Sequence, residues 1–133
     1  MLPMSTGLIL FAHGARDPRW ALPFEAVAAR VRAQRPGAAV RLAYLEFMAP
    51  TLPEAGADLA NAGCREVAVL PMFLGAGGHV RKDLPLLMDQ MRAAHPGVVF
   101  TLHAAVGEVD GVVAAMADVA LQAMAPAPPE ART

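Results

Sequence analysis

Two histidines in this sequence have the residue types and spacing of a metal-handling site. His13 directly follows the apolar run 7–12, and His79 follows the apolar run 67–74 after a short glycine-rich loop. Imidazole is the commonest protein ligand of metal ions, and a metal-free imidazole accepts protons near neutral pH. If both runs are parallel strands, both imidazoles leave the sheet at its carboxyl edge, where open α/β sheets bind ligands. The pair therefore predicts a site for one divalent metal ion.

Glu46 is the third candidate for this site. It stands between Leu45 and Phe47 at the end of a predicted strand, an unusual place for a solvated carboxylate. Two imidazoles and one carboxylate match the ligands of Co²⁺, Fe²⁺, Ni²⁺ or Zn²⁺. The same groups could act as general bases when no metal is bound. The alternative interpretation is an edge-strand charge or an ion-pair partner of Arg41.

Basic residues and glycines surround the two histidines. Cations near helix N-termini oppose the helix dipole, so four of them here favour a ligand-related role over ordinary helix charge. Arginine binds carboxylates through paired hydrogen bonds. The loop glycines allow close approach of a ligand but lack the spacing of a phosphate-binding loop. His95 and His103 are interpreted as structural, the latter packed inside a strand. The basic residues are Arg16, Arg19, Arg81 and Lys82, and the glycines are Gly75, Gly77 and Gly78.

Predicted strands and helices alternate along the chain. This β-α repeat predicts right-handed crossovers and a parallel sheet with helices on both faces. The first and third strands are apolar almost throughout, as central strands are. We therefore expect a flavodoxin-like three-layer α/β/α domain with four strands in the order 2-1-3-4, which puts His13 and His79 on neighbouring strands. The strands are 7–12, 38–47, 65–73 and 98–105, and the helices are 19–34, a segment from the cap Thr51 to 61–63, 80–94 and 108–124.

Composition bounds the class of protein. A chain of 133 residues that is 56% hydrophobic and 17% charged fits one folded domain, expected over 1–125, with a disordered Pro/Ala-rich tail over 126–133. No apolar run approaches the roughly 18 residues of a membrane span, and no basic segment typical of a signal peptide precedes the first strand. One cysteine, Cys64, fits a reducing cytoplasm. A net charge of −1 gives no support for nucleic-acid binding.

Three segments resemble the small sirohydrochlorin chelatases, the short members of the class II chelatases. They are His-Gly-Ala-Arg-Asp-Pro at 13–18, Leu-Glu-Phe-Met-Ala-Pro-Thr-Leu at 45–52, and Leu-Pro-Met-Phe-Leu-Gly-Ala-Gly-Gly-His-Val-Arg-Lys-Asp-Leu-Pro at 70–85. The resemblance runs from about Gly7 into the last predicted helix, and the third segment is its most specific part. This family inserts Co²⁺ or Fe²⁺, and in some members Ni²⁺, into sirohydrochlorin without a nucleotide, on the way to cobalamin or siroheme.

The resemblance implies roles for individual residues. His13 and His79 would handle the metal, and Glu46 would complete the catalytic set, with no cofactor beyond the metal substrate. Basic residues at the mouth would suit a tetrapyrrole with eight carboxylates. One departure is Ala15, where the family commonly has a serine whose hydroxyl could contact the substrate. The implied substrate-binding residues are Arg16, Arg19, Gly77, Gly78, Arg81 and Lys82.

Two other functions and one assembly state follow from the same residues. A carrier of metal or tetrapyrrole would use the same histidines without turnover. A phosphate-transferring enzyme with a nucleophilic histidine would need arginine two residues before His13, where Phe11 stands. Larger relatives look like two such domains in one chain, so we expect a homodimer that pairs through the site region. Its contact surface would be Phe47, Met48, Met72 and Phe73, unless these residues pack under helices.

Overall fold

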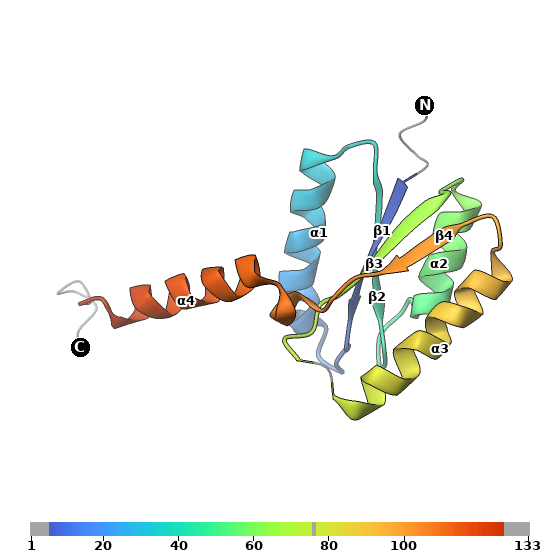
Figure 1. The fold of residues 1–133 in the computed structure, drawn as a ribbon. Helices are drawn as coiled ribbons and strands as arrows, with labels where there is room; N and C mark the ends of the chain where they lie inside the picture. Colours follow the sequence, from blue (N-terminus) through green and yellow to red (C-terminus); the bar gives the residue numbers. More distant parts are fainter. Residues whose placement is uncertain (1–5, 76, 127–133) are drawn as a thin grey trace.

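One parallel sheet of four strands organises the chain. The computed structural model describes residues 6–75 and 77–126, and the side chain of His79 lies outside that description, as does most of the predicted tail. The strands pair in the order β2-β1-β3-β4 (Figure 1). This confirms the predicted parallel sheet and its strand order. The strands are β1 (Thr6–Ala12), β2 (Ala39–Tyr44), β3 (Glu66–Pro71) and β4 (Val99–Leu102).

The strand register shows why β1 and β3 form the centre. Leu10 of β1 pairs with Leu42 of β2 on one side and with Leu70 of β3 on the other. Successive side chains of a strand point to opposite faces, so Leu10 faces one helical layer while Ile9 and Phe11 face the other. A strand apolar on both faces is stable only between two covering layers. The apolar character of β1 therefore fixes its central place and carries His13 to the middle of the carboxyl edge.

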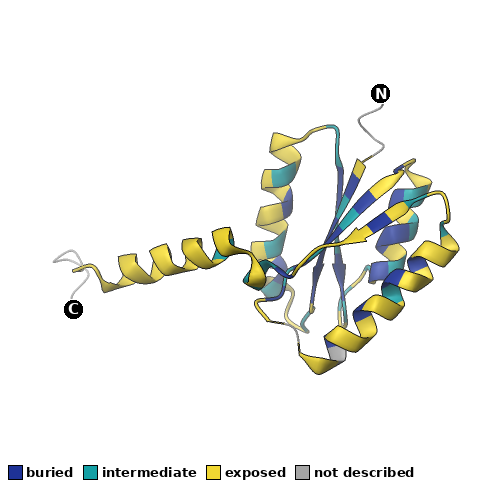
Figure 2. Cartoon of the chain, in the orientation of Figure 1, coloured by how far each residue is buried: buried dark blue, intermediate teal, exposed yellow. Residues whose placement is uncertain are grey.

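Helices cover both faces of the sheet. On one face lies α1 (Leu22–Gln34), which follows a short 3-10 helix, η2 (Pro18–Ala21). On the other face lie α2 (Leu52–Asn61) and α3 (Gly78–Ala94) (Figure 1). The larger hydrophobic core lies between these two helices and the sheet. Figure 2 shows the buried residues concentrated on the strands and on the sheet-facing sides of these helices.

The last helix departs from this layered plan. Helix α4 (Asp110–Met124) follows the 3-10 helix η3 (Val106–Glu108) and projects away from the body of the domain (Figure 1). It contains no buried residue and is exposed along its length (Figure 2). The predicted helix is present, but it does not cover the sheet of its own chain. Among the described residues, no helix is long and apolar enough to span a membrane.

A capping box fixes the start of α2. The Thr51 hydroxyl oxygen accepts a hydrogen bond from the Glu54 N–H at 3.3 Å, and the Glu54 carboxylate accepts one from the Thr51 N–H at 2.8 Å. This reciprocal pair satisfies two backbone donors that the helix leaves free. Thr51→Ala should therefore lower the free energy of unfolding by about 1 kcal/mol, measured by urea denaturation. Adding Glu54→Ala should cost clearly less in that background than alone. Additive losses would contradict a shared capping box.

Candidate functional site

His13 occupies the centre of the carboxyl edge, one residue beyond β1. Its carbonyl oxygen accepts a hydrogen bond from the Glu46 N–H at 3.0 Å, which joins it to the chain segment that follows β2. On the other side, its imidazole lies 4.4 Å from the phenyl ring of Phe73, measured between ring centroids. Phe73 is buried and follows β3, whereas His13 is exposed. The segment after β2 thus holds the backbone of His13, and the segment after β3 holds its imidazole, which stays open to a ligand.

Gly14 makes this arrangement possible. Its φ is +90°, a left-handed conformation that L side chains rarely adopt. A Cβ atom at this position would overlap the carbonyl oxygen of Glu46. Only glycine therefore lets the segments after β1 and β2 approach closely enough for the hydrogen bond between His13 and Glu46.

Glu46 lies in a turn after β2, because this strand ends at Tyr44 and not at residue 47 as predicted. Glu46 is exposed, and its backbone N–H bonds to the carbonyl oxygen of His13. The interpretation of Glu46 as the partner of Arg41 is wrong, because Arg41 donates to the carboxylate of Asp58 on α2 at 2.5 Å. Phe47 follows with a φ of +66°. The backbone of Glu46 thus lies at the carboxyl edge, next to the backbone of His13.

His79 lies in the first turn of α3, which begins at Gly78. Because β1 and β3 are neighbours, this turn starts from the same edge of the sheet as His13. The His79 side chain itself lies outside the described residues. Among the described side chains, no three His, Cys, Asp or Glu residues form a group that could hold a metal ion.

The predicted basic residues occupy different surroundings. Arg16 is exposed, and its guanidinium lies 4.9 Å from the centre of the Phe47 ring, within the range of a cation–π contact. Arg19 donates to the carboxylate of Asp17 at 2.8 Å, and this pairing holds the pKa of Asp17 below its usual value. Arg19 is therefore already engaged by a carboxylate of its own chain. Lys82 is exposed in the first turns of α3.

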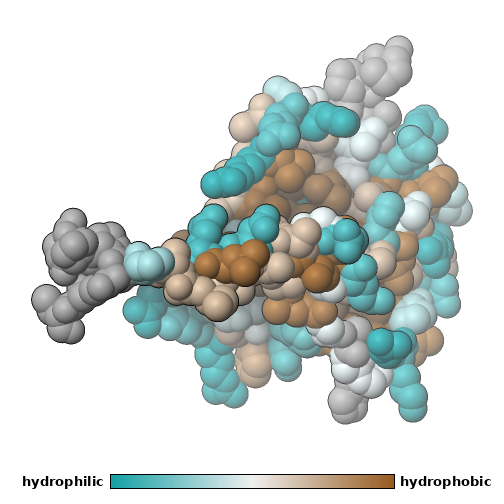
Figure 3. Space-filling view, turned by 60° about the vertical axis from the view of Figure 1, so that its left-hand side comes forward, coloured by the Kyte–Doolittle hydropathy of each residue, from teal (hydrophilic) through white to brown (hydrophobic). Residues whose placement is uncertain are grey.

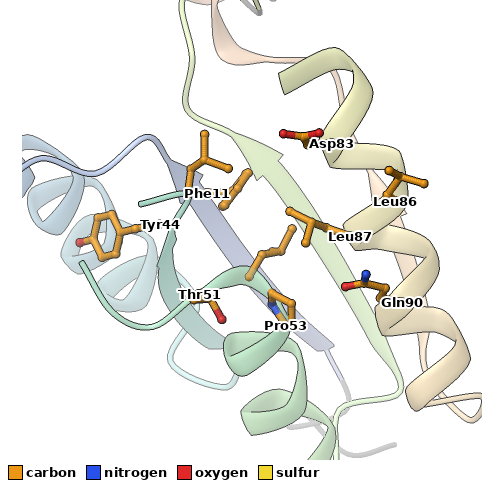
Figure 4. A pocket seen from close by; sticks show the side chains of 10 residues that line it. Phe11, Tyr44, Thr51, Pro53, Asp83, Leu86, Leu87 and Gln90 are labelled. Carbon is orange, nitrogen blue, oxygen red and sulfur yellow. The ribbon is translucent and has the colours of Figure 1, made fainter. Parts of the chain in front are cut away.

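A cleft of about 420 Å³ opens between α2 and α3 beside β1 (Figure 4). Phe11, two residues before His13, lines it together with apolar side chains of both helices. Tyr44 borders the cleft at the end of β2, but its ring points away from it and packs near Trp20 on the α1 face, where burial and the nearby charge of Glu25 raise the pKa of the phenol (Figure 4). The polar residues of the cleft on α3, Asp83 and Gln90, escaped the sequence analysis. Their seven-residue spacing, which places them on one helix face, is the pattern that could have identified them.

A second cleft of about 200 Å³ lies on the β4 side of Phe73. It is lined by Arg81, His103 and Glu108, among others, so Arg81 is associated with this cleft and not with the one beside α2. The prediction that His103 packs inside a strand is wrong. Strand β4 ends at Leu102, and His103, one residue beyond it, is exposed, as Thr101 and Leu102 of this edge strand are.

The apolar residues expected to form a contact surface at this edge divide into two groups. Phe73 is buried, and Met48 and Met72 are half-buried against a small core cluster, so these three pack inside the domain. Phe47 alone remains exposed, at 59% of its surface. Large apolar side chains that were not predicted join it on the surface near the edge: Leu74 after β3 and Leu86 on α3.

Sequence comparisons relate this chain to one protein family. The CbiX family model matches residues 7–123. The sirohydrochlorin cobaltochelatase of Methanococcus maripaludis is 32% identical over 81 residues, which cover 61% of this chain and 56% of that protein. The sirohydrochlorin cobaltochelatase of Methanocaldococcus jannaschii is 30% identical over 88 residues, which cover 66% of this chain and 62% of that protein. The matched segment thus spans less than two thirds of these relatives.

Structural comparisons agree with this relationship. A CbiX protein from Marinobacter aquaeolei has a crystal structure that matches with a TM-score of 0.78 and 32% identity, over 90% of this chain and 97% of that chain. SirB from Bacillus subtilis with Fe³⁺ matches with a TM-score of 0.76 and 20% identity, over 92% of this chain and 48% of that chain. At that identity the likeness to SirB establishes the fold alone.

Proposed function

This chain belongs to the CbiX family, and we propose that it is a chelatase that inserts Co²⁺, Fe²⁺ or Ni²⁺ into sirohydrochlorin. The observation that carries this proposal is the placement of His13: exposed, central on the carboxyl edge, and joined by backbone to Glu46. His79 starts α3 from the same edge. The names of the archaeal relatives, sirohydrochlorin cobaltochelatases, support the choice of substrate.

The reaction exchanges two protons for one metal ion. Sirohydrochlorin loses the protons of two pyrrole nitrogens, the divalent ion takes their place, and two protons leave to solvent. His13 and His79 would hold the ion before transfer, because a few imidazole ligands bind first-row metals without retaining them as thiolates would. Glu46 would accept a proton from the macrocycle. An exposed imidazole and an exposed carboxylate on adjoining segments of one edge could do both without a resident cofactor.

The surface around His13 suits a flat, apolar ring with acidic substituents. Arg16, Arg81 and Lys82 would bind carboxylates of the substrate, and Gly77 and Gly78 would let it approach the backbone. Arg19 would contribute less, because Asp17 already neutralises it. The apolar face of the macrocycle would lie against the exposed side chains of Phe47, Leu74 and Leu86 and the adjoining cleft.

Turnover separates this function from the alternative, a carrier that binds metal or tetrapyrrole with the same residues. One equivalent of protein is mixed with a tenfold excess of sirohydrochlorin and Co²⁺, and the metallated product is followed by its absorbance. A chelatase converts the whole excess faster than the protein-free reaction. Binding of Co²⁺ or sirohydrochlorin without acceleration beyond the first equivalent would identify a carrier, and the absence of both acceleration and binding would reject both functions.

Glu46→Gln tests the role of the carboxylate in proton transfer. The substitution keeps the size of the side chain but removes its charge and basicity. We expect the insertion rate at saturating metal to fall about a hundredfold or more. Glu66→Gln is the matched control, because Glu66 is an exposed residue at the opposite end of the sheet. Equal rates for Glu46→Gln and the unmodified protein would leave Glu46 with a structural role only.

We also propose that the chain acts as a homodimer. What supports this is the amount of apolar surface that a single copy leaves uncovered, of which Phe47 and Leu74 at the edge are one part. Because Met48, Met72 and Phe73 pack inside the domain, the site region offers less contact surface than the sequence suggested. The larger uncovered apolar surface is that of helix α4, which contains no buried residue (Figure 3).

A further inference from the structure

The cleft between α2 and α3 carries a charge whose sign is unexpected for the proposed substrate. Among the described residues that line this cleft, Asp83 alone is charged, and the others are apolar or neutral. Sirohydrochlorin carries carboxylates around its rim, and these would be bound by cationic side chains, not by another carboxylate. Asp83 therefore has a different role if the macrocycle enters this cleft.

Asp83 lies at the end of α3 that is nearest to the proposed metal site. Helix α3 begins at the carboxyl edge of the sheet, and Asp83 is in its second turn. Figure 4 shows the carboxylate of Asp83 on the side of α3 that faces the strands. Phe11, two residues before His13, and Leu45, the residue before Glu46, line the same cleft. The cleft thus reaches from the segments of both proposed site residues to Asp83.

The carboxylate of Asp83 is not engaged by any side chain or backbone group in the described part of the chain. By contrast, Asp17, Asp58 and Asp89 each form an ion pair with an arginine. Asp83 is exposed, and within residues 6–75 and 77–126 its side chain takes part in no hydrogen bond or ion pair. Nor do these residues place it in a group of three side chains that could hold a metal ion. The carboxylate is therefore available to a bound substrate.

Other described titratable groups near this edge are less suited to act on a substrate in the cleft. Asp17 is paired with Arg19, and the ring of Tyr44 points away from the cleft (Figure 4). His103 and Glu108 line the second cleft instead. On the α3 side of the first cleft, Asp83 is thus the group that can accept a proton.

We propose that Asp83 accepts the second of the two protons that metal insertion releases from the macrocycle. This rests on the proposed chelatase function, in which Glu46 accepts the first proton. At the second pyrrole nitrogen the N–H bond breaks, its electron pair stays on nitrogen and binds the entering metal ion, and the proton passes to a carboxylate oxygen of Asp83. Because Asp83 is exposed, it then returns the proton to solvent.

Asp83→Asn provides the first test, because the amide keeps the size of the side chain but is not a base. We expect kcat for Co²⁺ insertion to fall about a hundredfold, whereas the KM of sirohydrochlorin and the Kd of Co²⁺ change less than about threefold. Asp83→Glu retains a base and should keep at least about a tenth of the unmodified kcat. Asp89→Asn is the matched control on the same helix and should keep the full rate, because Asp89 pairs with Arg92 and is not among the residues that line the cleft.

An added base distinguishes proton transfer from a structural role of Asp83. In the Asp83→Ala protein, formate should raise the insertion rate in proportion to its concentration, because it can occupy the space of the missing carboxylate and take the proton. The same formate should leave the rates of the unmodified protein and of the Asp89→Ala protein unchanged.

Three results would overturn the proposal: equal rates for Asp83→Asn and Asp89→Asn, no response of the Asp83→Ala protein to formate, or a Co²⁺ Kd raised at least about tenfold by Asp83→Asn, which would make Asp83 a metal ligand. The unmodified protein in the same assay separates this failure from that of the chelatase function. If it turns over, only the role of Asp83 is wrong, and if it does not, both proposals are wrong.

Discussion

His13→Ala is expected to abolish metal insertion, lowering the rate by at least about a hundredfold, while the protein stays folded. The imidazole is exposed and lies against the ring of Phe73, so its loss removes little packing. The main chain of residue 13, which accepts the hydrogen bond from Glu46, is unchanged by the substitution. The effect should therefore fall on catalysis, and His79→Ala should have the same consequence.

The control for this experiment is His103→Ala. His103 is also an exposed histidine that follows a strand, but it lines the second cleft on the β4 side. Its removal should change the rate less than about threefold, and urea denaturation should give all three variants unfolding free energies within about 0.5 kcal/mol of the unmodified protein. Full activity of the His13→Ala protein would show that His13 takes no part in the reaction.

Gly14→Ala is expected to lower the free energy of unfolding by about 3 kcal/mol and to depress the insertion rate at the same time. The alanine must adopt a positive φ, which costs about 1–2 kcal/mol, and its Cβ must displace the carbonyl of Glu46, an overpacking that costs about 1–3 kcal/mol more. The displacement separates His13 from Glu46. Urea denaturation and the insertion assay on the same preparation measure both effects.

Gly63→Ala isolates the steric part of that loss. Gly63 also has a positive φ, of +94°, but a Cβ there would meet no atom within 4 Å. It should lose only about 1 kcal/mol and keep full activity. If Gly14→Ala cost no more than Gly63→Ala, the close approach of the two segments would not be a requirement of the site.

The sequence predicted those features that depend on local pattern. The apolar β1 and β3 could only be central strands, and this placed the segments of His13 and His79 on one edge. Thr51, with Pro53 and Glu54 in the turn that follows, predicted the start of α2, because helix capping depends only on residues close in the sequence. These features follow from periodicity and capping, which act over a few residues.

Other features depend on contacts between segments that are distant in the sequence. The turn that carries Glu46 exists because Gly14, thirty-two positions earlier, admits its carbonyl. Arg41 on β2 donates to Asp58 on α2, so it is not the ion-pair partner of Glu46 that the sequence suggested. The direction of α4 follows from the contact between Gly107 and Leu74, which no local pattern encodes. The sequence therefore placed the segments of His13 and His79 at one edge of the sheet, but it predicted neither the clefts beside that edge nor the uncovered helix.

The central claim is that the histidines after β1 and β3 converge on one metal ion. A crystal of the protein soaked with Co²⁺, with the ion located by its anomalous scattering, tests this directly. The account predicts a single ion at the carboxyl edge, roughly 2.0–2.3 Å from one imidazole nitrogen of His13 and one of His79, by analogy with zinc–imidazole distances. Imidazoles that point into separate clefts, or an ion bound by neither, would contradict it.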